Sequence, residues 1–137
     1  MSVLMDDIFK HHIQVQSMLN DFVVHKSFEE RIDLLQKYKP MVTRYFKSSC
    51  ALYNFLKTTP SSNDNLKTTL RRYAKGMNND ARTIIAFYLK YGHGCEESKH
   101  FKFQVELAEA HAILTHRIET EEKYLIPAYL SLKKVNI

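Results

Sequence analysis

The hydrophobic residues of this chain recur every three or four positions over most of its length, a spacing that predicts amphipathic α-helices. The first such stripe runs from about Val3 to Val24. A second stripe follows the capping-box sequence Ser27-Phe28-Glu29-Glu30 and lasts about 30 residues, or roughly 45 Å of helix. Pro40 lies inside this second stripe. It is expected to kink or split the helix, because proline removes one backbone hydrogen bond and clashes with the preceding turn.

Two more helices complete the pattern. The stretch 58–65, TTPSSNDN, is the clearest loop in the chain. A third helix, capped by Asn63 or Asp64, is expected to run to the Gly-His-Gly sequence at 92–94. A fourth extends from about Glu96 to Leu132. Four long amphipathic helices with short connections predict an all-α fold, arranged as an up-down-up-down four-helix bundle.

Composition supports one helical domain over residues 1–137, because the chain has the length of a single domain and only three glycines and three prolines. The apolar runs are too short to cross a bilayer, so no membrane association is expected. Early carboxylates at Asp6 and Asp7 occupy positions where a secretory signal carries basic residues, which predicts a cytoplasmic protein. Cys50 and Cys95 form no metal or redox motif and are expected to be reduced thiols.

The net charge of +5 is unevenly distributed along the chain. Residues 26–92 hold 13 Lys and Arg against 5 Asp and Glu, whereas the remainder holds 7 against 10. The densest cationic group lies in the third predicted helix and consists of Lys67, Arg71, Arg72 and Lys75. Such a group is either a solvated helix face or a surface that binds nucleic acid through its phosphates.

The sequence contains no nucleophile elbow, phosphate-binding glycine loop or paired-cysteine zinc motif, so no enzymatic activity and no cofactor are predicted. The seven histidines raise one alternative, a hemerythrin-like di-iron bundle. The spacing of His116 and Glu121 resembles the ligand pair in the last helix of hemerythrins, and His11 completes the candidate ligand set. The distribution of histidines argues against this site, since none lies between residues 26 and 92.

Glu121 continues the inward face of the fourth predicted helix, where an unpaired carboxylate would be costly. Arg117, one turn earlier on the same face, and His11 of the first helix are the expected partners. These three residues therefore form a predicted internal polar cluster, and the alternative is that Glu121 is a functional carboxylate. The other histidines have plainer expectations, with His111 bordering the core and three facing solvent: His12, His25 and His100.

The stretch 101–126, FKFQVELAEAHAILTHRIETEEKYLI, resembles the last helix of the Rsd/AlgQ family of sigma-factor-binding regulators. The residues that match the family pattern without a gap are Phe103, Gln104, Leu107, Leu114, Arg117, Ile118, Glu121, Glu122, Leu125 and Ile126. A second stretch, 38-YKPMVTRYFKSSC-50, is similar to part of the family's second helix. There Arg44 stands where relatives carry an aspartate implicated in the sigma contact, and Cys50 replaces a histidine.

The resemblance implies a helical bundle that binds the carboxy-terminal domain of the housekeeping sigma factor and limits its use by RNA polymerase. That sigma domain is basic because it contacts DNA phosphates, so a carboxylate-bearing surface can compete for it. Acidic residues remain on the first and fourth helices of this chain. The expected partner-binding residues are accordingly Asp21, Arg44, Glu119 and Glu122.

Overall fold

The computed structural model describes residues 3–24, 27–59, 64–92 and 94–135. Three long helices come first: α1 (Val3–Val23), α2 (Phe28–Thr58) and α3 (Asp64–Tyr91). The last part of the chain is a series of helical segments: a 3-10 turn η1 (Glu97–Lys99), α4 (His100–Thr120), a π-helical turn η2 (Glu121–Leu125) and α5 (Ile126–Val135). The described residues contain no strand, and the predicted all-α class is confirmed.

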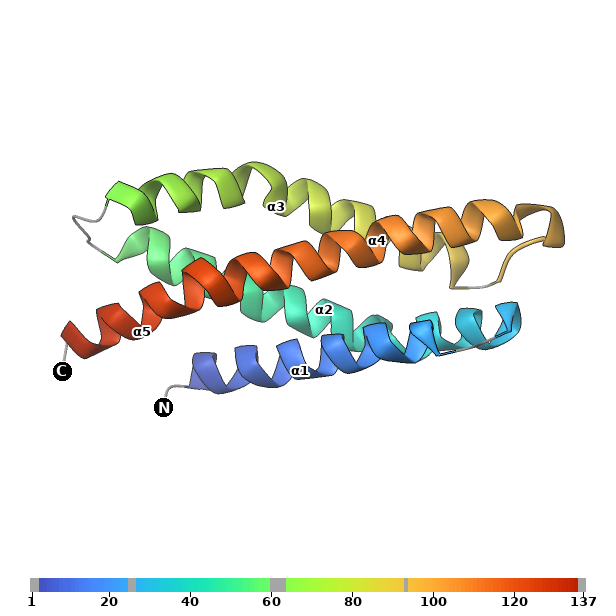
Figure 1. Cartoon of the computed structure of the whole chain (residues 1–137), viewed down its shortest axis with the longest axis horizontal. Helices are drawn as coiled ribbons and strands as arrows, with labels where there is room; N and C mark the ends of the chain where they lie inside the picture. Colours follow the sequence, from blue (N-terminus) through green and yellow to red (C-terminus); the bar gives the residue numbers. More distant parts are fainter. Residues whose placement is uncertain (1–2, 25–26, 60–63, 93, 136–137) are drawn as a thin grey trace.

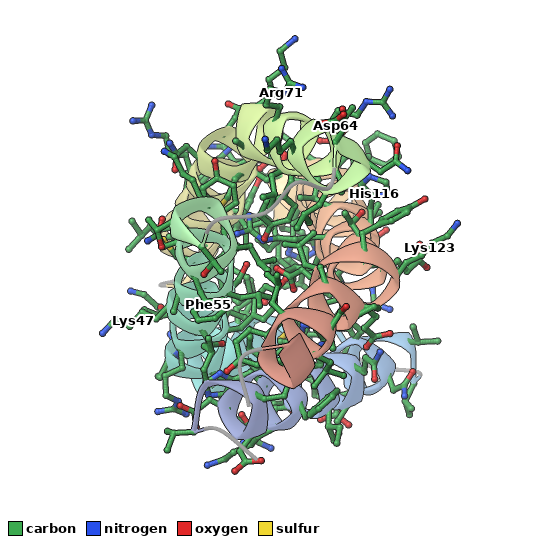
Figure 2. All side chains as sticks on the ribbon, turned by 90° about the vertical axis from the view of Figure 1, so that its left-hand side faces the viewer. Lys47, Phe55, Asp64, Arg71, His116 and Lys123 are labelled. Atoms are coloured by element: carbon green, nitrogen blue, oxygen red, sulfur yellow. The ribbon has the colours of Figure 1, made fainter. Side chains whose placement is uncertain are left out.

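Figure 1 shows the long helices side by side, with successive connections at opposite ends of the molecule and α5 extending the line of α4. Figure 2 looks along the helices and shows them at four sides of a common core, with α1 opposite α3 and α2 opposite α4 and α5. The core is therefore lined by all four helical columns, and a buried side chain on one column can meet partners from the other three.

The start of α2 has the predicted cap. Ser27 accepts a hydrogen bond from the backbone N–H of Glu30 at 3.2 Å, and the Glu30 carboxylate accepts one from the backbone N–H of Ser27 at 3.2 Å. Pro40 lies within α2, which continues as one helix from Phe28 to Thr58. The helix is thus not split there, and a kink at Pro40 stays a prediction.

The fourth predicted helix contains a wide turn that the hydrophobic spacing did not indicate. At η2 the backbone N–H of Ile126 donates to the carbonyl of Glu121, five residues back instead of four. Pro127 follows directly, and it has no N–H to give to the turn before it. A π turn just ahead of a proline relieves the clash between the proline ring and the preceding carbonyls.

Buried residues form two apolar clusters at different levels along the helices. The first cluster lies toward the α1–α2 and α3–α4 connections and includes Phe22, Phe87, Tyr91 and Phe103. The second lies toward the chain termini and includes Met5, Leu52, Leu70 and Leu125. Between these levels each helical column contributes polar side chains, so a polar layer separates two apolar cores.

In the described part of the chain, no helix combines the length and the hydrophobicity needed to cross a membrane. Both cysteines are free, Cys50 on the surface and Cys95 half-buried. Two sequence-based expectations, an Asn63 cap for the third helix and an exposed His25, fall outside the described residues.

Candidate functional site

The centre of the polar layer is the carboxylate of Glu121, which is 0% exposed at the start of η2. One oxygen accepts hydrogen bonds from His12 Nε2 and from the Tyr45 hydroxyl, each at 2.8 Å. The other accepts a hydrogen bond from the Tyr73 hydroxyl at 2.6 Å and another from Ser49. Donors from α1, α2 and α3 therefore converge on one carboxylate from the fourth column.

Arg117 lies one turn before Glu121 and is also buried, with 4% of its surface exposed. Its Nε is 3.7 Å from the Glu121 carboxylate, and its Nη2 donates to Ser49 Oγ at 2.9 Å. Its Nη1 donates to the backbone carbonyl of Met77 at 3.1 Å, which joins α4 to the middle of α3. The guanidinium also stacks against the rings of Phe46 and Tyr73, at 4.8 and 5.3 Å from their centroids.

His12 links this buried cluster to the surface. Its Nε2 contacts Glu121 at 2.8 Å, and its Nδ1 contacts a carboxylate oxygen of the half-exposed Glu122 at 3.2 Å. The two ring nitrogens of His12 thus each lie within hydrogen-bonding distance of a carboxylate, one buried and one half-exposed. Arg117 supplies the buried positive charge beside the Glu121 carboxylate.

Burial would by itself raise the pKa of Glu121, because it removes water from the charged form. Hydrogen bonds from His12, Ser49 and Tyr73 outweigh that cost and hold the pKa below its ordinary value of 4.5. Conversely, burial together with the neighbouring Glu121 charge raises the pKa of the Tyr45 and Tyr73 hydroxyls. The layer therefore contains an ionised carboxylate held by two neutral phenols.

The predicted internal cluster of His11, Arg117 and Glu121 is only partly assembled by the structure. Arg117 and Glu121 lie together in the core, as the inward spacing indicated. His11 instead makes a 2.8 Å hydrogen bond from its Nδ1 to Ser48. The histidine that reaches Glu121 is His12, and the expectation that His12 faces solvent is wrong, since only 3% of it is exposed.

The other histidines differ from one another. His100 is half-buried with its ring stacked on Phe28, so the expectation that it faces solvent is also wrong. His111 lies at the core edge with its ring edge-on to Phe22 at 4.8 Å between centroids. Burial lowers the pKa of His111 to about 4, because its charged form has lost water without gaining a partner.

The ligand set of the metal alternative does not converge. His116 is exposed on α4, while His11 bonds to Ser48 and the oxygens of Glu121 are already occupied by protein donors. Across the described ranges, no group of three or more His, Cys, Asp or Glu side chains could hold a metal ion.

The predicted partner-binding residues occupy separate places. Glu119 and Glu122 are exposed on neighbouring turns of α4 and η2, and Arg44 is exposed on α2. Asp21 is half-buried and accepts a hydrogen bond from the Tyr38 hydroxyl, which raises the pKa of Tyr38 to about 12. Of the predicted acidic contact residues, Asp21 therefore has a partner within the protein, while Glu119 and Glu122 are exposed.

Four residues that hydrogen-bond to Glu121 were missed by sequence reasoning, namely His12, Tyr45, Ser49 and Tyr73. Tyr73 falls on the apolar stripe of the third predicted helix, where a tyrosine is expected to be an ordinary core-edge ring, and Tyr45 lies in the stretch 38–50, where no role was predicted for its hydroxyl. The paired Ser48 and Ser49 on α2, both buried, were a usable signal, because small hydroxyl residues in an apolar stripe imply a polar partner opposite.

No model of a known protein family, no curated protein and no solved structure matches this chain.

Proposed function

We propose that this chain, folded as an up-down-up-down four-helix bundle, is a cytoplasmic transcription regulator that binds the carboxy-terminal domain of the housekeeping sigma factor. It would limit use of that sigma factor by RNA polymerase through contact alone, without catalysis. The proposal starts from the resemblance of residues 101–126 to the last helix of the Rsd/AlgQ family. Most residues of that resemblance are buried, so they act as the scaffold, and the contact surface must come from their exposed neighbours.

The observation that carries the proposal is the contact between His12 and Glu122, which joins α1 to η2 at the surface. Phe9, one turn before His12, and Ile13, directly after it, are large apolar side chains with 38% and 67% of their surface exposed. Together with the exposed carboxylates of Glu119 and Glu122 they form what we call the α1–η2 surface, defined by these four residues. A surface that combines exposed apolar side chains with carboxylates suits a basic protein domain.

A binding assay with the purified sigma domain tests this proposal. Isothermal titration calorimetry is expected to give a dissociation constant in the micromolar range or tighter. Reversal of charge in Glu119→Lys is expected to weaken binding roughly tenfold, since a like charge then faces the basic domain. Glu109→Lys on the same helix is the matched control, because Glu109 is exposed but lies outside the α1–η2 surface. Absence of binding at micromolar concentrations rejects the proposal.

Arg44 offers a second arm of the test. The pKa of His11 on α1 is lowered mainly by burial, and it is also raised by the charge of Asp7 and lowered by the charge of Arg44. Arg44 therefore lies beside α1. The family carries an aspartate at this position. The Arg44→Asp variant is therefore expected to tighten sigma binding. Weaker binding by this variant would show that a carboxylate at position 44 of α2 does not contact the sigma domain.

A second candidate function has one observation in its favour. Lys67, Arg71, Arg72 and Lys75 are all exposed on α3, and Figure 2 shows Arg71 projecting away from the core. Their spacing places them on neighbouring turns, where they can contact successive phosphates. An electrophoretic shift of generic DNA that disappears steeply with added salt would favour nucleic-acid binding, whereas no shift at low salt would eliminate it.

A further inference from the structure

A groove of about 900 Å³ runs between α3 and the continuous column of α4, η2 and α5. This volume lies in the range of sites that hold small organic molecules. Tyr73 and Arg117, both members of the polar layer, form part of its lining, so its base is fixed by the hydrogen bonds described above. The groove is on the side of α4 that carries His116 and Lys123, away from Lys47 and Phe55 of α2 (Figure 2).

Two features keep the groove open. Gly76 in the middle of α3 borders it, and a Cβ placed there would meet only the side chain of Asp80, at 3.4 Å. The absent side chain at this position therefore leaves room in the groove rather than permitting close helix packing. On the opposite wall the π turn η2 presents Lys123 and the half-exposed ring of Tyr124. Such turns occur frequently at functional sites, because they redirect side chains that a regular helix would place elsewhere.

The lining combines cations with apolar surface. Arg72 from α3 and Lys123 from η2 are exposed cations on facing walls, and Asp80 is the single carboxylate among the described lining residues. Apolar contact surface is available from Met77, Tyr124 and Ala128. An acid group between the two cations, attached to an apolar body, would satisfy both kinds of surface.

We propose that this groove binds a small organic anion with an apolar body, its acid group paired with Arg72 and Lys123 and its body against Tyr124 and Ala128. The site is distinct from the proposed sigma contact, since none of the four residues of the α1–η2 surface lines the groove. An anion that binds this groove in the folded protein, and not the unfolded chain, also stabilises the fold.

The aromatic sulfonate 1-anilinonaphthalene-8-sulfonate serves as the probe, and the uncharged N-phenyl-1-naphthylamine reports apolar contact without the acid group. The wild-type protein is expected to bind one sulfonate dye saturably and to show an increase in melting temperature with dye concentration. The double variant Arg72→Gln with Lys123→Gln is expected to weaken the sulfonate dye at least fivefold and to leave the uncharged dye within about twofold. Lys75→Gln with Arg82→Gln removes the same charge from exposed α3 positions outside the groove and serves as the control.

Gly76→Leu separates occupancy of the groove from loss of folding. Leucine is a much better helix former than glycine, so this variant is expected to melt at a higher temperature while losing both dyes. Retention of sulfonate binding by a cooperatively folded Gly76→Leu protein would overturn the proposal. Equal weakening by the groove pair and the control pair would do the same, because it would mark the dye as bound by diffuse positive charge. Sigma binding is measured on the same variants, and its presence or absence does not enter this result.

Discussion

The apolar cluster near the α1–α2 and α3–α4 connections and the polar layer around Glu121 are equally buried but are held together differently. In the first, rings such as those of Tyr91 and Phe103 pack edge-on with centroids 5.0 Å apart, and many side chains share the stabilisation. In the second, one carboxylate collects four hydrogen bonds from three helices. An apolar core tolerates exchange of similar residues, whereas a buried charge depends on every partner.

The two regions also have different structural roles within the bundle. Apolar packing accounts for burial without fixing the relative height of the helices, because neighbouring apolar residues on a stripe are interchangeable. The polar layer specifies that height, since His12, Tyr45, Tyr73 and Glu121 must meet at one level to satisfy one another. By fixing the height of α1 relative to η2, the polar layer also positions the α1–η2 surface. His12 contacts both the buried Glu121 and the surface residue Glu122.

The largest expected effect comes from Arg117→Met, which removes the buried cation beside Glu121 and keeps most of the side-chain volume. Removing one partner of a buried ion pair costs about 3–5 kcal/mol of unfolding free energy. Ile118→Val, the adjacent buried residue in the apolar cluster, is the matched control and is expected to cost about 1 kcal/mol. Chemical denaturation measures both, and similar costs for the two variants would erase the difference between the regions.

A pH titration of stability is the next largest effect. His111, at the edge of the apolar cluster, has an ordinary pKa of 6.5 and a folded-state pKa of about 4. Its contribution is complete above pH 6.5 and is lost as the pH falls through about 4, because only the unfolded chain binds the proton in between. The loss amounts to at most about 3 kcal/mol. His111→Leu is expected to flatten this part of the curve, and an unchanged slope in the variant would exclude His111 as its source.

Tyr73→Phe removes one donor from Glu121 and leaves the ring in place. A hydrogen bond to a charged group contributes about 1.5–3 kcal/mol, so a loss of that size is expected in thermal or chemical unfolding. Tyr53→Phe is the matched control, since the Tyr53 ring packs 5.8 Å from that of Tyr73 but does not reach Glu121 among the described contacts. Equal losses in the two variants would show that the Tyr73 hydroxyl adds nothing specific to the layer.

The smallest expected loss of unfolding free energy comes from Ser27, which lies outside both regions and serves as a reference for them. Ser27→Ala breaks the capping box at the start of α2 and is expected to cost about 1 kcal/mol. Ser27→Gly retains much of the cap preference and should cost only a few tenths of that amount. Circular dichroism melts can resolve the two, and a Ser27→Ala loss as large as that of Arg117→Met would indicate that stability differences do not report the polar layer.

The helices themselves could be predicted, because periodic apolar spacing records which face of each helix is buried. The capping box at Ser27 and the inward position of Glu121 were predicted on the same basis. The π turn was not, since apolar spacing alone treats Glu121 and Pro127 as ordinary helix positions. The choice of His12 over His11 was also beyond the pattern. The two are adjacent and both buried, and only the neighbouring helices decide that His11 meets Ser48 while His12 meets Glu121.

Carbon-13 NMR of the Glu121 side-chain carboxyl during acid titration tests most directly whether a single ionised carboxylate organises this bundle. Glu109, exposed on the preceding helix α4, supplies the internal reference. The expected result is that the Glu121 resonance keeps its carboxylate position as the pH falls below 4.5 and changes only at more acidic pH, with loss of the folded state. Protonation of Glu121 at or above pH 4.5 in the folded protein would contradict the account.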